Sequence, residues 1–179
     1  MMRIQYLSKK SVKGILQALE SRREIDPSFV AMLKDAEEVK VVYSEKFEIV
    51  VFDDKIALFK RADLDIYMPT LYIVNVLYNT QKLLVVPTVV VDEGAVAPLK
   101  RGADVMLPGI KKVLKDFSKG DIVAVMDPSE RYLLVIGLAL TSSSAIAPGA
   151  KGKGIENVSH IEDDLWKSCL QLAKTFSHK

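Results

Sequence analysis

Lys100 and Arg101, followed directly by Gly102, are the residues of this chain whose types and spacing best suit a chemical task, the binding of phosphate groups. They stand within residues 89–110, VVVDEGAVAPLKRGADVMLPGI. Two adjacent cations can neutralise phosphates, and a glycine has no side chain to hold a nucleic-acid backbone at a distance. The plain alternative is that the two cations solubilise the end of a helix and that the glycine only terminates it.

Residues able to carry out catalysis are scarce. The chain has two histidines, His160 and His178, and one cysteine, Cys169, without the spacing of a zinc site or of a Cys/His nucleophile pair. The three acids at 162–164 are better explained as caps of a following helix than as a cation site. The segment AIAPGAKGKG fails the spacing of a phosphate loop, because isoleucine follows its last glycine. We therefore expect no catalytic residue, no metal and no cofactor.

The elements around the two cations form one short unit. Three consecutive valines at 89–91 predict a buried strand. Because Pro98 lacks an N–H and is tolerated in a first turn, the next helix is expected to begin near Gly94 or Ala95. The two cations then fall in its last turn, and the glycine after them can take the left-handed conformation that ends a helix. A second strand is expected over residues 103–107.

The first part of the chain predicts an α+β arrangement. Ser8 and Ser11 offer N-caps to a helix with apolar residues at helical spacing, and Asp26-Pro27 is typical of a helix start. Short β-rich runs separated by turn residues predict an antiparallel meander. Residues 71–79 fit a helix, although their β-branched residues would also suit a strand. The expected elements are helices over 12–19, 27–36, 71–79 and 165–176, and strands over 39–43, 47–52 and 56–59.

Composition and charge restrict the class of protein. The 179 residues, 49% of them hydrophobic, can fill proper cores. The longest apolar runs are about half of the ~20 residues that a membrane-spanning helix needs. The N-terminal segment lacks the apolar core of a signal peptide, and a single cysteine cannot form an internal disulfide, so we expect a cytoplasmic protein. A net charge of +2 means that any basic surface is a local patch.

Four segments occur in an order and spacing that resemble the PUA domain, the RNA-binding barrel named after pseudouridine synthases and archaeosine transglycosylases. They are DEGA with LKRGADVMLPGI, FSKGDIVAV, YLLVIGLAL and KGKGIENVSHIEDDLW. The first half resembles the "pre-PUA" domain of the malignant T-cell-amplified sequence family and its archaeal relatives. The resemblance implies an α+β fold, in which a pre-PUA domain of residues 1–84 packs on a PUA pseudo-β-barrel of residues 85–179 that includes the C-terminal helix.

The resemblance also implies which residues bind RNA, because PUA domains hold RNA with the short helix, the glycine loop after it and the neighbouring strands. We expect exposed N–H groups of Gly102 and Ala103 to donate to phosphates or base edges, and Asp104 to contact a base edge. The predicted RNA-binding residues are Lys100, Arg101, Gly102, Ala103, Asp104, Pro108, Gly109, Lys151 and Lys153.

The function implied by the resemblance is non-enzymatic RNA binding in translation. The RNA would be tRNA, recognised near its acceptor end, or ribosomal RNA of the small subunit. Family members act on the small ribosomal subunit beside a protein with an initiation-factor-like domain, so such a protein is an expected partner. Two alternatives remain open: an RNA-binding accessory subunit of a tRNA or rRNA modification enzyme, and a protein–protein adaptor that has lost RNA binding.

Overall fold

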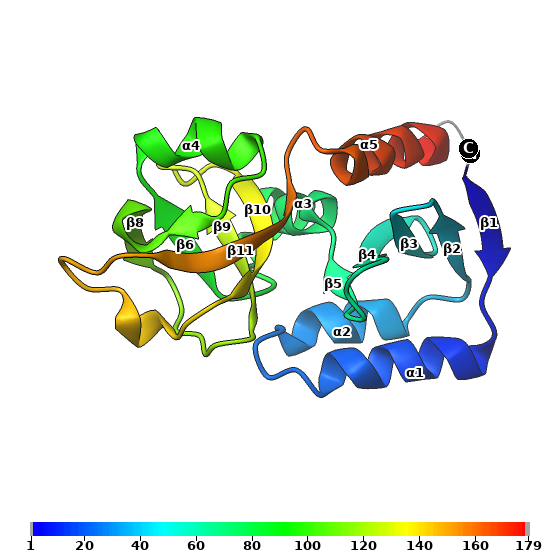
Figure 1. Cartoon of the computed structure of the whole chain (residues 1–179). Coiled ribbons are helices and arrows are strands. Elements are labelled where there is room, and N and C mark those ends of the chain that lie inside the picture. Colours follow the sequence, from blue (N-terminus) through cyan, green and yellow to red (C-terminus); the bar gives the residue numbers. More distant parts are fainter. Residues whose placement is uncertain (1, 178–179) are drawn as a thin grey trace.

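Two β-sheets, with a helix between them, organise the chain (Figure 1). The computed structural model describes residues 2–177. A five-stranded antiparallel sheet has the order β1-β2-β3-β4-β5, and a six-stranded sheet has the order β7-β11-β10-β9-β6-β8. The expected α+β fold is confirmed. None of the helices described is long and apolar enough to cross a membrane.

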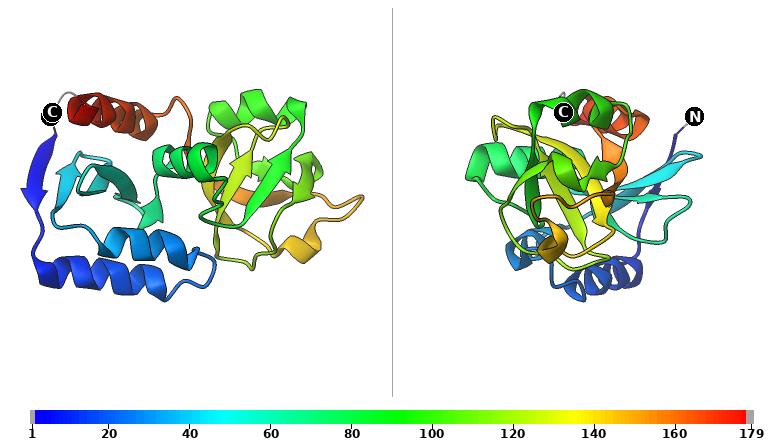
Figure 2. Two further views of the ribbon diagram at one scale, coloured as in Figure 1. Left: turned by 180° about the vertical axis from the view of Figure 1, so that it is seen from behind. Right: turned by 60° about the vertical axis from the view of Figure 1, so that its left-hand side comes forward.

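The first sheet lies between two layers of helix, as the view from behind shows (Figure 2). Helices α1 and α2 cover one face and α5 covers the other. The predicted caps Ser8 and Asp26 are confirmed, since Ser8 accepts a hydrogen bond from the N–H of Ser11 and Asp26 from that of Ser28. Ser11, also predicted as a cap, lies inside α1. The elements are β1 (Arg3–Tyr6), α1 (Lys9–Glu20), α2 (Pro27–Lys34), β2 (Val39–Tyr43), β3 (Phe47–Phe52), β4 (Lys55–Arg61), β5 (Met68–Pro69) and α5 (Asp164–Ser177).

The second sheet curls into a nearly closed barrel. Its pairs are antiparallel except β6 with β9, which run parallel. Alternate apolar residues, among them Val89 and Val91, fill the interior. The elements are β6 (Thr88–Val91), α4 (Glu93–Lys100), β7 (Val105–Met106), a 3₁₀ turn (Leu107–Gly109), β8 (Ile110–Val113), β9 (Ile122–Met126), β10 (Leu133–Ala139), a second 3₁₀ turn (Ser143–Ala145) and β11 (Lys153–His160).

Two predicted boundaries around α4 are wrong. The helix begins at Glu93, not at Gly94 or Ala95, because Asp92 caps it by accepting the N–H of Ala95 at 3.0 Å. Pro98 therefore lies beyond the first turn, where it has no N–H to donate to the carbonyl of Gly94 four residues earlier. The strand expected over 103–107 is reduced to Val105–Met106, since the chain forms a 3₁₀ turn from Leu107.

Polar side chains bind the two sheets together through backbone groups. Helix α3 (Leu71–Gln81) lies between the sheets, and the buried amide of Asn75 accepts the N–H of Leu133 at 2.8 Å and donates to its carbonyl at 3.0 Å. On another side, the buried Glu24 accepts the N–H of Ile122 at 2.8 Å. One continuous apolar core runs through both parts. The sheets therefore form one packed body rather than two linked units.

The predicted domain boundary after residue 84 stays a prediction. The first sheet ends with β5 and the second begins with β6, so the interval that contains the proposed boundary holds α3 and the segment after it. Helix α5, which we assigned to the second domain, packs its buried Leu165, Cys169 and Leu172 into the core shared with the first sheet. Its contacts thus extend across both parts of the chain.

We predict that Asn75→Leu lowers the free energy of unfolding by about 2 to 4 kcal/mol, because the N–H and the carbonyl of Leu133 would each lose a buried partner. Urea denaturation followed by circular dichroism measures this change. Thr80→Ala, on the exposed side of the same helix, is the matched control and should change stability by roughly 0.5 kcal/mol or less. Equal effects of the two substitutions would contradict the proposed role of Asn75 in holding Leu133.

Candidate nucleic-acid interface

The end of α4 is closed by its own backbone hydrogen bonds. The N–H of Gly102 donates to the carbonyl of Leu99 at 3.0 Å, and the N–H of Ala103 donates to that of Pro98 at 3.1 Å. Gly102 has φ +94°, the left-handed conformation that this type of helix end requires. Our expectation that these two N–H groups are free donors for RNA is therefore wrong, because the helix end already uses both. The remaining candidate role of this helix end is to let a nucleotide approach closely at Gly102.

Asn157 of β11 fixes this helix end in place. Its side-chain amide donates to the carbonyls of Leu99 at 3.1 Å and Ala103 at 2.9 Å. Its backbone N–H donates to Asp104 Oδ1 at 2.9 Å. The amide orientation is dictated by the two carbonyls, so Oδ1 of Asn157 is left buried and without a hydrogen-bond partner among residues 2–177. Nothing in the sequence marked Asn157, because its partners lie more than fifty residues away.

Asp104, predicted to contact a base edge, is occupied by protein contacts. One carboxylate oxygen accepts the N–H of Asn157, and the other lies 3.1 Å from Nζ of Lys153. The bond from the Asn157 N–H, together with the nearby ammonium of Lys153, holds the pKa of Asp104 below its ordinary value, although partial burial opposes this. Asp104 is therefore a carboxylate at neutral pH, and it positions Lys153 beside the end of α4.

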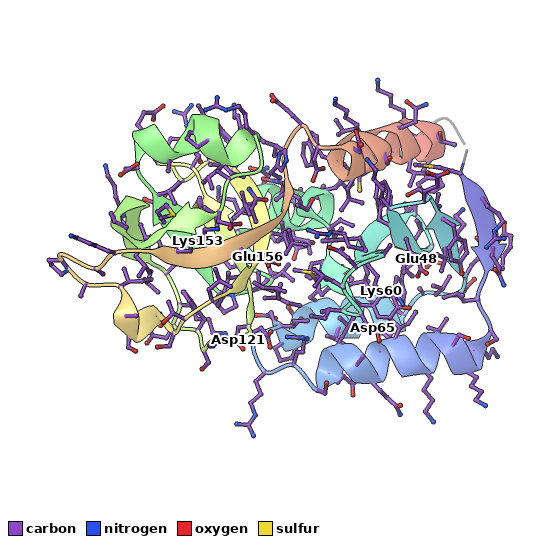
Figure 3. The ribbon with its side chains drawn as sticks, in the orientation of Figure 1. Glu48, Lys60, Asp65, Asp121, Lys153 and Glu156 are labelled. Carbon is purple, nitrogen blue, oxygen red and sulfur yellow. The ribbon has the colours of Figure 1, made fainter. Side chains whose placement is uncertain are left out.

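The structure places the second predicted basic segment beside the loop and the short strand that follow α4. Lys153 lies opposite Met106 in the pairing of β11 with β7, and the N–H of Leu107 donates to the carbonyl of Gly152 at 2.8 Å. Lys153 and Glu156 lie along β11 (Figure 3). Arg101, Lys151 and Lys153 are exposed, and Lys100 is half-buried. The surface formed by residues 100–106 and 151–153 is the candidate interface.

Pro108 and Gly109 play a structural part beside this interface. They belong to the 3₁₀ turn between β7 and β8, and the carbonyl of Gly109 accepts the N–H of Asp92 at 2.9 Å. Pro108 is exposed and Gly109 half-buried. They support the loop at the start of α4 rather than its basic end.

His160 is a neighbour of the interface that sequence reasoning missed. A Cβ added to Gly102 would lie 3.4 Å from Nε2 of His160, so the ring stands directly beside the bare glycine. Nδ1 of His160 lies 2.8 Å from the carbonyl of Ile161, which assigns the ring proton to Nδ1 in the neutral form. Nε2 is then a hydrogen-bond acceptor that faces the loop.

A bulge in β11 connects the interface to the first sheet. The pairing of β10 with β11 shifts by one residue at Val158, and the carbonyl of Val158 accepts a hydrogen bond of 3.2 Å from Arg61 of β4. Gly137 lies opposite, where a Cβ would come within 2.3 Å of the carbonyl oxygen of Glu156. Only glycine admits this close passage of the two strands.

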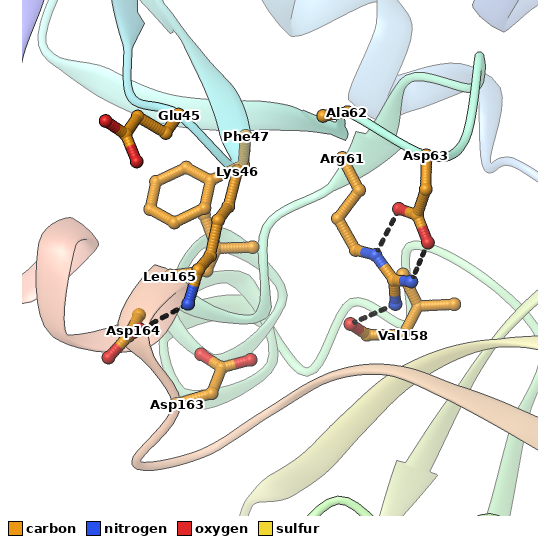
Figure 4. Close-up of a pocket in the computed structure, with 10 residues that line it drawn as sticks. All are labelled: Glu45, Lys46, Phe47, Arg61, Ala62, Asp63, Val158, Asp163, Asp164 and Leu165. Carbon is orange, nitrogen blue, oxygen red and sulfur yellow. Dashed lines mark hydrogen bonds and ion pairs between the residues drawn. The ribbon is translucent and has the colours of Figure 1, made fainter.

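A cavity of about 430 Å³ opens at this junction between β3, β4, β11 and α5 (Figure 4). Arg61 binds the carboxylate of Asp63 and holds the pKa of that group below its ordinary value. The lining residues are Glu45, Lys46, Phe47, Arg61, Ala62, Asp63, Val158, Asp163, Asp164 and Leu165. Its acids outnumber its bases, so it suits phosphate poorly, and it contains none of the predicted RNA-binding residues. Within residues 2–177, no cluster of His, Cys, Asp and Glu could hold a metal ion.

Comparison with known protein families identifies the barrel. The model of the PUA domain matches residues 87–161. An uncharacterized protein of Methanocaldococcus jannaschii is 32% identical over 161 residues, which cover 90% of this chain and 93% of the relative. Malignant T-cell-amplified sequence 1 of Rattus norvegicus is 29% identical, with 89% of this chain and 87% of the relative covered. Translation machinery-associated protein 20 of Saccharomyces cerevisiae is 25% identical, with 88% of each chain covered.

Solved structures share the whole architecture. A hypothetical protein of Pyrococcus horikoshii superposes with a TM-score of 0.78 at 31% identity, over 93% of this chain and 99% of that one. A PUA-domain structure from Aeropyrum pernix, a tartrate complex, also superposes with a TM-score of 0.78 at 26% identity, over 97% and 94% of the two chains. These relatives extend beyond the barrel into the first sheet. The chain therefore belongs to the family of PUA-domain proteins that comprises the malignant T-cell-amplified sequence proteins and their archaeal relatives.

Proposed function

We propose that this protein binds RNA in translation without acting as an enzyme, and that its ligand is tRNA near the acceptor end or ribosomal RNA of the small subunit. The observation that carries the proposal is a PUA barrel in which the exposed Lys153 of β11 is ion-paired with Asp104, in the loop that follows the cations Lys100 and Arg101 at the end of α4. The name of the yeast relative links the family to the translation machinery. A cytoplasmic location and a partner with an initiation-factor-like domain belong to the same proposal.

Phosphate contacts supply the affinity in this mechanism. Arg101 and Lys151 are exposed, and no ion pair involves either of them among residues 2–177. The ammonium of Lys153 forms an ion pair with the carboxylate of Asp104. Each phosphate neutralised contributes a slope of roughly −0.7 for single strands to −0.9 for duplex in the dependence of log K on log salt. A few cations therefore give a modest salt dependence and an affinity near the micromolar range.

Base recognition would come from the groups that flank the cations. The exposed Gly102, which has no side chain, allows a nucleotide to approach the helix end closely. Nε2 of His160 is an acceptor on the adjoining strand, and an acceptor of this kind pairs with the amino groups of cytosine and adenine. These positions support a preference for an exposed single-stranded end over a continuous duplex.

The experiment that tests the function is fluorescence anisotropy with labelled tRNA, either intact or lacking its 3′-terminal CCA, at two salt concentrations. We expect removal of CCA to weaken binding by about tenfold or more, since the terminal bases would lose their contacts. Equal affinities that fall with salt would mean unspecific phosphate contact and would point to ribosomal RNA or to a modification-enzyme complex. The absence of binding would favour the adaptor alternative.

Arg101→Glu should weaken RNA binding by about tenfold without unfolding the protein, because it replaces an exposed cation by an anion at the proposed contact. Lys119→Glu is the matched control, since it makes the same change of charge at an exposed position of the same barrel outside the interface. Anisotropy titrations and thermal unfolding of both variants distinguish a local contact from a general effect of charge. If both variants bind equally well, the helix end is not the site.

Asn157→Leu tests whether the conformation of the helix end matters. It removes both amide bonds to the carbonyls of Leu99 and Ala103 but leaves every cation in place. We expect weaker RNA binding with an unchanged salt slope, and faster hydrogen exchange at the amides of Gly102 and Ala103. RNA affinity that stays at the wild-type level despite faster exchange would show that binding does not depend on this conformation.

A further inference from the structure

The outer edge of the first sheet carries an exposed apolar strand. Strand β1 is the terminal strand of the sheet, and all four of its residues are exposed. Met2, Ile4 and Tyr6 expose 42%, 56% and 63% of their surface, respectively. Large apolar side chains gathered at one place on a surface mark an interaction site more often than single ones do. Figure 1 shows β1 at the far end of the molecule from the barrel.

The backbone of β1 is open toward solvent at the same three residues. The N–H of Leu7 donates to the carbonyl of Val39 at 2.9 Å, which makes this pair a hydrogen-bonded one in the pairing of β1 with β2. By the two-residue period of antiparallel strands, Arg3 and Gln5 also direct their backbone groups toward β2. The N–H and carbonyl groups of Met2, Ile4 and Tyr6 therefore point outward, and none has a partner among residues 2–177.

The three apolar side chains share one face of the sheet. Ile4 lies opposite the buried Val42, and Tyr6 lies opposite Lys40, whose ammonium stands 4.5 Å from the ring centre of Phe176 in α5. The apolar side chains thus lie on the α5 face, beside the helix. Arg3 lies on the other face, with its guanidinium 4.9 Å from the ring centre of Tyr43.

We propose that β1 pairs antiparallel with β1 of a second copy of this chain, with Ile4 at the two-fold axis. Ile4 then faces Ile4 of the second copy, and Met2 faces Tyr6. This register uses every outward N–H and carbonyl of the three residues, since each opposed pair is of the hydrogen-bonded kind. A register shifted by two residues would leave Met2 or Tyr6 without an opposed partner.

The side chains of β1 are complementary to themselves in this register. The apolar residues of both copies form one continuous patch on the α5 face. On the other face, Arg3 lies opposite Gln5 of the second copy, so no like charges are directly opposed. Strand β1 contains neither lysine nor proline, two residues that commonly protect exposed edges from pairing. A second copy is therefore the occupant that satisfies the backbone, the apolar side chains and the charge at once.

Sedimentation equilibrium of the full chain over a wide range of concentrations tests the proposal. We expect a reversible monomer–dimer equilibrium, with a dissociation constant of roughly tens of micromolar because the strand is short. Ile4→Lys should weaken the dimer at least about tenfold, since it opposes two ammonium groups at the axis. Gln5→Glu should strengthen it, because it places a carboxylate opposite Arg3 of the second copy. Thermal unfolding of each variant shows that the monomer is intact.

Cysteine cross-linking tests the register. Ile4→Cys places two thiols on hydrogen-bonded opposed residues, with Cα atoms roughly 5.5 Å apart, within the range of a disulfide. Gln5→Cys is the matched control, because its two Cα atoms would be about 8 Å apart. Burial raises the pKa of the native Cys169 thiol to about 12, so that it should not compete during mild oxidation.

The results separate the proposal from its alternatives. A disulfide dimer from Ile4→Cys, and little from Gln5→Cys, would support the two-fold at Ile4. A wild-type protein that sediments as a monomer at every concentration would overturn the proposal, and so would a dimer that Ile4→Lys leaves unchanged. RNA binding plays no part in these measurements, so their outcome is independent of the proposed function.

Discussion

The passage of β11 over Gly137 is the constraint on which the arrangement of this molecule depends. Because a side chain at that position would collide with the carbonyl of Glu156, glycine alone lets the strands cross so closely. The extra residue that follows, Val158, turns its carbonyl out of the ladder and toward Arg61 of the first sheet. On the barrel side of the bulge, Asn157 reaches the end of α4. One irregularity thus orients both the neighbouring sheet and the candidate interface.

Backbone groups at irregular positions are satisfied by side chains from distant parts of the chain. Asn75 accepts the N–H of Leu133 where β10 begins, and Glu24 accepts the N–H of Ile122 where β9 begins. Arg61 donates to the carbonyl of Val158. Each of these bonds is directional and lies in or beside a shared apolar core. The two sheets are consequently joined by directional hydrogen bonds as well as by apolar packing.

Features of short range could be predicted from the sequence, and those of long range could not. The helices with Ser8 and Asp26 as caps were predicted, because a cap acts within three residues. The strands β1 and β5 were missed. The two residues of β5 are too few for a periodic signal, whereas the apolar and polar residues of β1 do alternate and could have indicated a strand. The left-handed Gly102 at the end of α4 was predicted, while the role of Asn157 and the contact of Lys153 with Asp104 required the fold, because these partners lie far apart in the sequence.

The ion pair between Lys153 and Asp104 has a consequence for the time course of binding. A phosphate that approaches Lys153 competes with a carboxylate already 3.1 Å away, and that carboxylate is kept in place by the N–H of Asn157. Association at this lysine is therefore an exchange of one anion for another. When the phosphate leaves, the carboxylate of Asp104, held by the N–H of Asn157, can form the ion pair with Lys153 again. For the proposed binding of RNA, such an exchange favours short residence times.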